Sequence, residues 1–163
     1  MKAYKGYTLI ELVIVIIVMA VLSMTFATFI IKAVDSWIFV KTRDSAFGSA
    51  RYSMNRMLVD MRRMTSPYGI TVMTSTECSF EAFDSTGGVV YIDFKQSGAN
   101  LYRNNDILAE NLLNPGGLSF LYLNENGVST SEAVGVRSVR VKVSIEKNNQ
   151  LITLESAARL RNL

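Results

Sequence analysis

An apolar run close to the N-terminus constrains this sequence more than any other feature. No charged residue occurs from Leu12 to Ile31, and Leu9 and Ile10 extend the apolar stretch toward the N-terminus. A helix over Leu9 to Ile31, rising about 1.5 Å per residue, would be about 35 Å long. Because the hydrocarbon core of a bilayer is about 30 Å thick, the run predicts a transmembrane helix.

The charges that flank the run predict its orientation. Lys2 and Lys5 precede it, whereas Lys32 and Asp35 follow it. Basic residues accumulate on the cytoplasmic side of membrane helices. We therefore expect a single-pass protein of the inner membrane with its N-terminus in the cytoplasm. The rest of the 163-residue chain would form one small periplasmic or extracellular domain.

Glu11 is the exception within this segment, because a carboxylate in an apolar run is costly unless it has a partner. An ordinary secretory signal has a shorter apolar region and a cleavage site of small residues. Here the small residues Ser23, Ala27 and Thr28 are separated by Met24, Phe26 and other bulky side chains. Neither a plain anchor nor a plain secretory signal explains Glu11.

The segment Lys5-Gly6-Tyr7-Thr8-Leu9-Ile10-Glu11-Leu12 resembles the class III signal of type IV prepilins and type II secretion pseudopilins. The resemblance implies that a prepilin peptidase cuts after Gly6 and then methylates the new N-terminal amine of Tyr7. The family usually has Phe at the position of Tyr7. Tyrosine keeps the aromatic ring, and we do not expect it to prevent cleavage.

The resemblance also gives Glu11 a partner. Cleavage after Gly6 would create an ammonium group on Tyr7, about one helical turn from the Glu11 carboxylate. In a filament of packed helices, Glu11 of an incoming subunit would neutralise the Tyr7 amine of its neighbour, where an unpaired charge is costly. This is the predicted assembly salt bridge. A simpler alternative is that Glu11 lies close enough to the interface to snorkel into water.

Composition argues against catalysis and against nucleic-acid binding. The chain has no His, and its single Cys, Cys78, cannot form an intrachain disulfide, so we interpret it as structural. The 17 Lys and Arg residues are scattered among 14 Asp and Glu residues and form no basic tract. We predict no catalytic residue, metal site or cofactor, and no nucleic-acid partner. The loops that contain Asn104 to Asp106 and Asn124 to Gly127 are interpreted as turns.

An amphipathic pattern follows the apolar run and ends before Pro67, which predicts a helix that continues to near Met64. The predicted buried stripe consists of Phe47, Ala50, Met54, Met57, Leu58, Met61 and Met64. The predicted exposed face holds Arg51, Ser53, Asn55, Arg56, Asp60, Arg62 and Arg63. We favour core packing for the methionines over an adaptable partner-binding surface.

Short alternating runs separated by Gly, Asn and Ser follow Pro67 and predict antiparallel strands. The expected strands are 79–83, 89–95, 101–103, 118–123, 135–146 and 151–160. The predicted fold class is α+β and pilin-like, with a long N-terminal helix packed on an antiparallel sheet. The predicted divisions are a leader (1–6), a transmembrane or filament-core helix (7–31), an amphipathic stalk helix (32–66) and a globular sheet domain (67–163).

Weaker motifs point to a subtype. The segments Met57–Arg63, Leu101–Arg103 and Arg159–Asn162 resemble J-type pseudopilins and W-type minor pilins, which implies a place in a tip complex that primes assembly. The expected partners are prepilin peptidase, other pilin or pseudopilin subunits, the inner-membrane assembly platform and membrane lipid. The alternative is a single-pass, membrane-anchored binding or sensor domain that is never processed.

Overall fold

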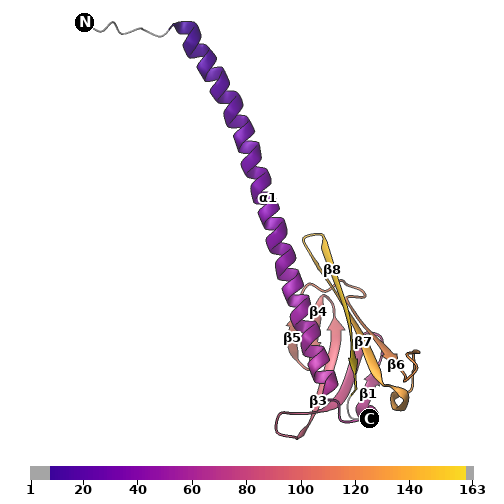
Figure 1. Ribbon diagram of the computed structural model, residues 1–163. Helices are drawn as coiled ribbons and strands as arrows, with labels where there is room; N and C mark the ends of the chain where they lie inside the picture. The colour runs from indigo at the N-terminus through magenta and orange to yellow at the C-terminus, as the bar shows by residue number, and fades with distance from the viewer. Residues whose placement is uncertain (1–7, 161–163) are drawn as a thin grey trace. The chain divides into compact units, whose positions relative to one another are not determined.

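The computed structural model describes residues 8–160, which divide into two units between Lys41 and Thr42. The first unit is helical from Leu9 onward, and the second contains the remainder of the same helix together with all the strands. Figure 1 shows this helix, α1 (Leu9–Arg62), and the strands that follow it. The predicted α+β class, one long N-terminal helix with antiparallel sheets, is confirmed.

The second unit contains two antiparallel sheets. In the first sheet the strands follow one another in chain order, and in the second β7 lies between β6 and β8. The first sheet consists of β1 (Ile70–Met73), β2 (Glu77–Phe83), β3 (Val89–Ser97), β4 (Asn100–Arg103) and β5 (Asp106–Ala109). The second consists of β6 (Leu118–Leu123), β7 (Ser138–Lys147) and β8 (Gln150–Arg159). Two short 3-10 helices, η1 (Pro67–Gly69) and η2 (Ala133–Gly135), precede β1 and β7.

Residues 42–62 of α1 contribute one stripe of side chains to the core of the second unit. The predicted methionines lie in this stripe, since Met54, Met57 and Met61 are all buried. They belong to the same apolar cluster as Phe80 and Phe94 of the first sheet and the inward-facing valines of β7. Methionine is flexible and a good helix former, so it can fill the irregular space between a helix and two sheets. The prediction of core packing is confirmed for these positions.

The predicted assignment was wrong at one position of the buried stripe and at two positions of the exposed face. Phe47 keeps 43% of its surface exposed, whereas Ser53 and Asp60 are buried. The buried face is therefore rotated toward polar residues that sequence hydrophobicity excludes. Both polar residues have partners, because the Ser53 hydroxyl donates to the Ala50 carbonyl at 3.0 Å and Asp60 pairs with Arg56 and Arg103.

The strand predictions differ from the structure mainly at their ends. Five of the six expected strands correspond to β2, β3, β4, β6 and β8 within two residues at each end. The sixth, β7, begins at Ser138 because η2 occupies the first residue of the predicted range. The strands β1 and β5 were missed, because Val72 and Met73 in β1, and Ile107 to Ala109 in β5, are consecutive apolar residues that break the alternation expected of a strand. Helix α1 ends at Arg62, and Met64 instead forms a bridge with Ala82.

A buried ion pair joins α1 to the first sheet. The Asp60 side chain is 2% exposed, and its Oδ2 accepts a hydrogen bond from Nε of Arg103 on β4 at 2.8 Å. Nε of Arg56, one turn earlier in the helix, lies 3.2 Å from the same oxygen. Removing either the carboxylate or its closest guanidinium would leave a buried group uncompensated, and this would destabilise the fold. The pair therefore specifies which turn of α1 faces β4.

Arg103→Ala should lower the free energy of unfolding by about 3–5 kcal/mol, because it leaves a buried carboxylate without its closest partner. The measurement is urea unfolding of the full chain in detergent micelles, followed by circular dichroism. Arg140→Ala is the matched control, since the Arg140–Glu155 pair is about half exposed and should contribute at most about 1 kcal/mol. Equal effects of the two substitutions would contradict the account.

Candidate functional site

The first turn of α1 contains a hydrogen-bonded cap formed by Thr8 and Glu11. The Thr8 backbone N–H donates to Glu11 Oε2 at 3.1 Å, and the Thr8 hydroxyl donates to the same oxygen at 3.2 Å. In return the Glu11 N–H donates to the Thr8 hydroxyl oxygen at 3.4 Å. This reciprocal arrangement is a capping box, which satisfies backbone donors that the first turn would otherwise leave unpaired.

The capping box is the feature that sequence reasoning missed. Its signal is present as Thr8-Leu9-Ile10-Glu11, a threonine followed three residues later by a glutamate at the start of an apolar helix. The hydrogen bonds hold the carboxylate at the helix start but do not neutralise its charge, because each donor is neutral. Glu11 therefore remains available for a cationic partner. The predicted partner, the amine of Tyr7, and the predicted cleavage residue Gly6 lie outside the described residues.

The apolar side chains of residues 9–31 are exposed along the whole helix. Even the least exposed of the large ones, Val13, retains 43% of its surface. The segment is long and apolar enough to cross a membrane, and within the described residues it is the one helix of this kind. Such a surface is unfavourable in water and favourable in lipid or against other apolar helices. It is the part of the molecule that most needs an external partner.

The few hydroxyl groups in this segment are satisfied within the helix itself. The Ser23 hydroxyl donates to the Met19 carbonyl at 2.7 Å, and the Thr28 hydroxyl donates to the Thr25 carbonyl at 2.8 Å. Thr25 in turn donates to the Leu22 carbonyl at 2.8 Å. Because these groups need no water, they are compatible with a position in hydrocarbon.

An aromatic residue and a basic residue follow the apolar run on the same helix. The Lys41 ammonium lies 4.9 Å from the centre of the Trp37 ring, in a cation–π arrangement. Tryptophan and lysine are enriched where membrane helices reach the headgroup region. The pair is suited to the end of a membrane-spanning segment.

Comparison with known proteins bears directly on this N-terminal segment. Residues 1–27 match the family model described as the prokaryotic N-terminal methylation motif. The chain carries the class III signal of type IV pilin-like proteins. No curated protein and no solved structure matches the chain. Together, the motif and the exposed apolar helix indicate a membrane-anchored, pilin-like protein.

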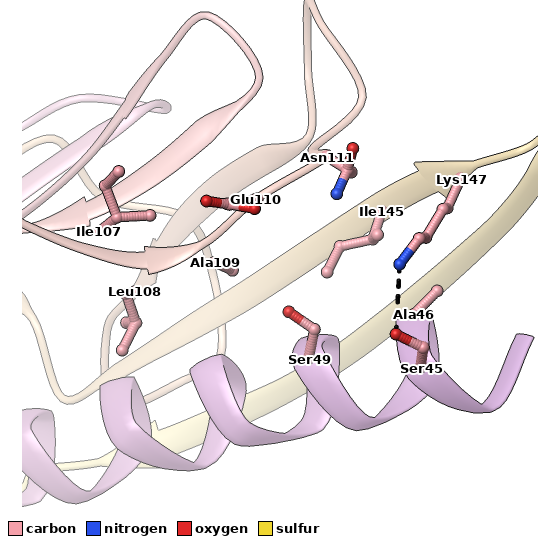
Figure 2. A pocket seen from close by; sticks show the side chains of 10 residues that line it. All are labelled: Ser45, Ala46, Ser49, Ile107, Leu108, Ala109, Glu110, Asn111, Ile145 and Lys147. Atoms are coloured by element: carbon pink, nitrogen blue, oxygen red, sulfur yellow. Dashed lines mark hydrogen bonds between the residues drawn. The ribbon is translucent and has the colours of Figure 1, made fainter. Parts of the chain in front are cut away.

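The second unit of this pilin-like chain has a pocket of about 370 Å³ between α1, β5 and β7 (Figure 2). Its polar lining is mixed in charge, with Glu110 and Asn111 near β5, Ser49 on α1, and Lys147, whose ammonium donates to the Ser45 hydroxyl at 3.3 Å. One carboxylate and one ammonium give no catalytic pair that we can assign. Among the described residues, no group of three or more Cys, Asp or Glu side chains could hold a metal ion. We therefore assign the candidate site to the N-terminal segment.

Cys78 on β2 is fully buried in the core. Burial raises the pKa of its thiol to about 12; a hydrogen bond with Tyr122 opposes this rise, and the nearby Asp93 carboxylate adds to it. The single hydroxyl proton of Tyr122 is shared between the backbone carbonyls of Thr74 and Glu77, which lie 3.1 and 3.2 Å from the hydroxyl oxygen. The thiol is therefore protonated and enclosed at neutral pH, which agrees with a structural role.

The native chain should resist labelling by a maleimide at about pH 8, because the Cys78 thiol is protonated and the reagent cannot reach it. Labelling should become complete once urea unfolds the second unit and returns the pKa to its ordinary value. The measurement is the mass of the chain after timed exposure to the reagent. Thr76→Cys, which places a thiol at an exposed position two residues away, is the control and should label rapidly. Equally rapid labelling of the native wild-type chain would contradict this assignment.

Proposed function

We propose that this chain is a minor pilin or pseudopilin, made as a prepilin and cut between Gly6 and Tyr7. Prepilin peptidase would remove residues 1–6 and methylate the amine of Tyr7. The observation that carries the proposal is the methylation motif over residues 1–27, combined with a charged Glu11 in the first turn of an otherwise apolar helix. Cleavage would give that carboxylate an ammonium partner. This pairing accounts for the presence of a charged residue in an apolar helix.

Assembly would follow from the same two groups. Residues 9–31 would lie in the membrane before assembly and against the same segment of other subunits afterwards. In both surroundings the dielectric constant is low, so an unpaired Glu11 or an unpaired Tyr7 amine would be costly. Pairing Glu11 of one subunit with the Tyr7 amine of its neighbour removes both costs. It also specifies the axial position of each new subunit.

The proposed location is the inner membrane, as a single-pass protein with residues 42–163 on the periplasmic or extracellular side. The partners would be prepilin peptidase, other pilin or pseudopilin subunits, the assembly platform and membrane lipid. The J-type and W-type resemblance of Met57–Arg63 and Leu101–Arg103 supports a place in a tip or priming complex. The structure puts these two segments at the end of α1 and on β4, where Asp60 and Arg103 form the buried pair.

The rival function is an anchored binding or sensor domain that is never processed. The capping box favours this rival in one respect, because it gives Glu11 a structural role without any amine. The two functions differ in what they require of the Glu11 side chain. A cap needs a hydrogen-bond acceptor, whereas a salt bridge needs a negative charge.

Glu11→Gln separates these requirements, because glutamine retains the acceptor for the Thr8 N–H and removes the charge. We expect Glu11→Gln and Glu11→Ala to be inserted in the membrane normally and to be lost from filaments. The measurement is the amount of the chain in sheared filament fractions compared with membrane fractions, by immunoblot. Loss of a buried ion pair of this kind corresponds to about 3–5 kcal/mol.

Thr8→Val provides the matched control, since it removes the hydroxyl of the cap and leaves the Glu11 charge in place. It should be incorporated into filaments like the wild-type chain, provided that its processing is intact. Wild-type incorporation of Glu11→Gln would contradict the salt bridge and would leave the cap as the role of Glu11.

A further inference from the structure

The pocket between α1, β5 and β7 has an apolar floor and a polar rim (Figure 2). The floor is formed by Ala46, Ala109 and Ile145, which are all buried. The volume of about 370 Å³ lies within the range of small-molecule sites, about 300–1,000 Å³. A ligand that fits this pocket would be small and would place an apolar group on the floor.

Main-chain hydrogen bonds hold one wall of the pocket in place. The Glu146 N–H donates to the Asn111 carbonyl at 2.8 Å, and the Leu113 N–H donates to the Ser144 carbonyl at 2.9 Å. These two bonds fasten the segment that follows β5 to the strand β7. Because the wall is formed before any ligand arrives, binding does not have to order it, and this favours affinity.

Two opposite charges line the pocket without pairing with each other. Glu110 follows β5, and Lys147 is the last residue of β7. In the view of Figure 2, Ile145 lies between the two side chains. Within residues 8–160 neither forms an ion pair, and the Lys147 ammonium donates instead to the neutral hydroxyl of Ser45 at 3.3 Å. Each charge is therefore available to a ligand group of the opposite sign.

Two further polar groups on the rim are also available. The Ser53 hydroxyl bonds back to the carbonyl of Ala50 within α1, as serines in helices often do. The Ser49 hydroxyl, which Figure 2 shows on the side of α1 that faces the pocket, makes no hydrogen bond with the described part of the chain. The same holds for the side-chain amide of Asn111. Both groups can donate hydrogen bonds to a ligand.

We propose that this pocket binds a free α-amino acid with an apolar side chain. The ammonium of the ligand would pair with Glu110, and its carboxylate would pair with Lys147 and accept a hydrogen bond from Ser49. Hydrogen bonds between opposite charges of this kind are stronger than neutral ones. The side chain of the ligand would lie over Ala46 and Ile145. A ligand with a charge of one sign would leave the other rim charge without a partner, whereas a zwitterion pairs with both.

The test uses the full chain in detergent micelles, with L-alanine, L-valine and L-leucine as separate probes. Titration followed by saturation-transfer NMR gives the dissociation constant of each, and we expect at least one of them to bind. Glu110→Gln and Lys147→Met should each lower the affinity about tenfold, since each removes one charge-assisted contact. Glu132→Gln and Lys142→Met are the matched controls, because both residues are exposed and lie outside the pocket. The controls should bind like the wild-type chain.

Derivatives of the bound amino acid identify the partner of each charge. The amide derivative lacks the carboxylate, so Lys147→Met should not weaken its binding further. The N-acetyl derivative lacks the ammonium, so Glu110→Gln should not weaken its binding further. Combining a change in the ligand with a change in the protein in this way isolates each pairwise contact.

Ser45→Ala separates the charge of Lys147 from its hydrogen bond to α1, and it should lose less affinity than Lys147→Met. Urea unfolding establishes that each variant is folded. The proposal would be overturned by the absence of binding for all three amino acids, by unchanged binding in either Glu110→Gln or Lys147→Met, or by a derivative that binds as tightly as the free amino acid. Because neither processing nor assembly enters the measurement, its outcome is independent of the proposed function.

Discussion

The need to cover the apolar surface of residues 9–31 restricts this chain to a membrane or to an assembly of apolar helices. These side chains are exposed along their whole length, and a surface of this kind is stable only in lipid or against other apolar helices. Glu11 lies at the start of this surface, where its charge is unfavourable in either surrounding. A process that supplies a cationic partner and then packs many such helices together satisfies both demands. Cleavage next to Tyr7 followed by filament assembly is such a process.

The second unit is organised around a different electrostatic pair. Asp60 on α1 and Arg103 on β4 meet in the interior at 2.8 Å, and around them the methionines of α1 fill the space beside the two sheets. The pair links the last turns of the helix to the first sheet. Replacement by apolar residues would be compatible with stability, so the benefit that we infer for the pair is the specification of one helix orientation among several similar ones.

The sequence predicted the elements that strong periodicity marks. The apolar run, the methionine stripe and the alternation of β7 each produce a pattern over many residues, and each is present in the structure. The strands β1 and β5 show no such pattern, because each contains consecutive apolar residues, Val72-Met73 in β1 and Ile107-Leu108-Ala109 in β5. Asp60 was placed on the exposed face because its partner, Arg103, is distant in the sequence. The capping box could have been predicted, since Thr8 and Glu11 have the required spacing.

The central claim concerns the bond between Gly6 and Tyr7, and the mass of the mature N-terminus tests it most directly. The chain would be purified from the membranes of cells that contain a prepilin peptidase and measured intact, with fragmentation of its N-terminal residues. The account predicts a chain that begins with N-methylated Tyr7. A chain that retains Met1 or Lys2 in such cells would contradict it.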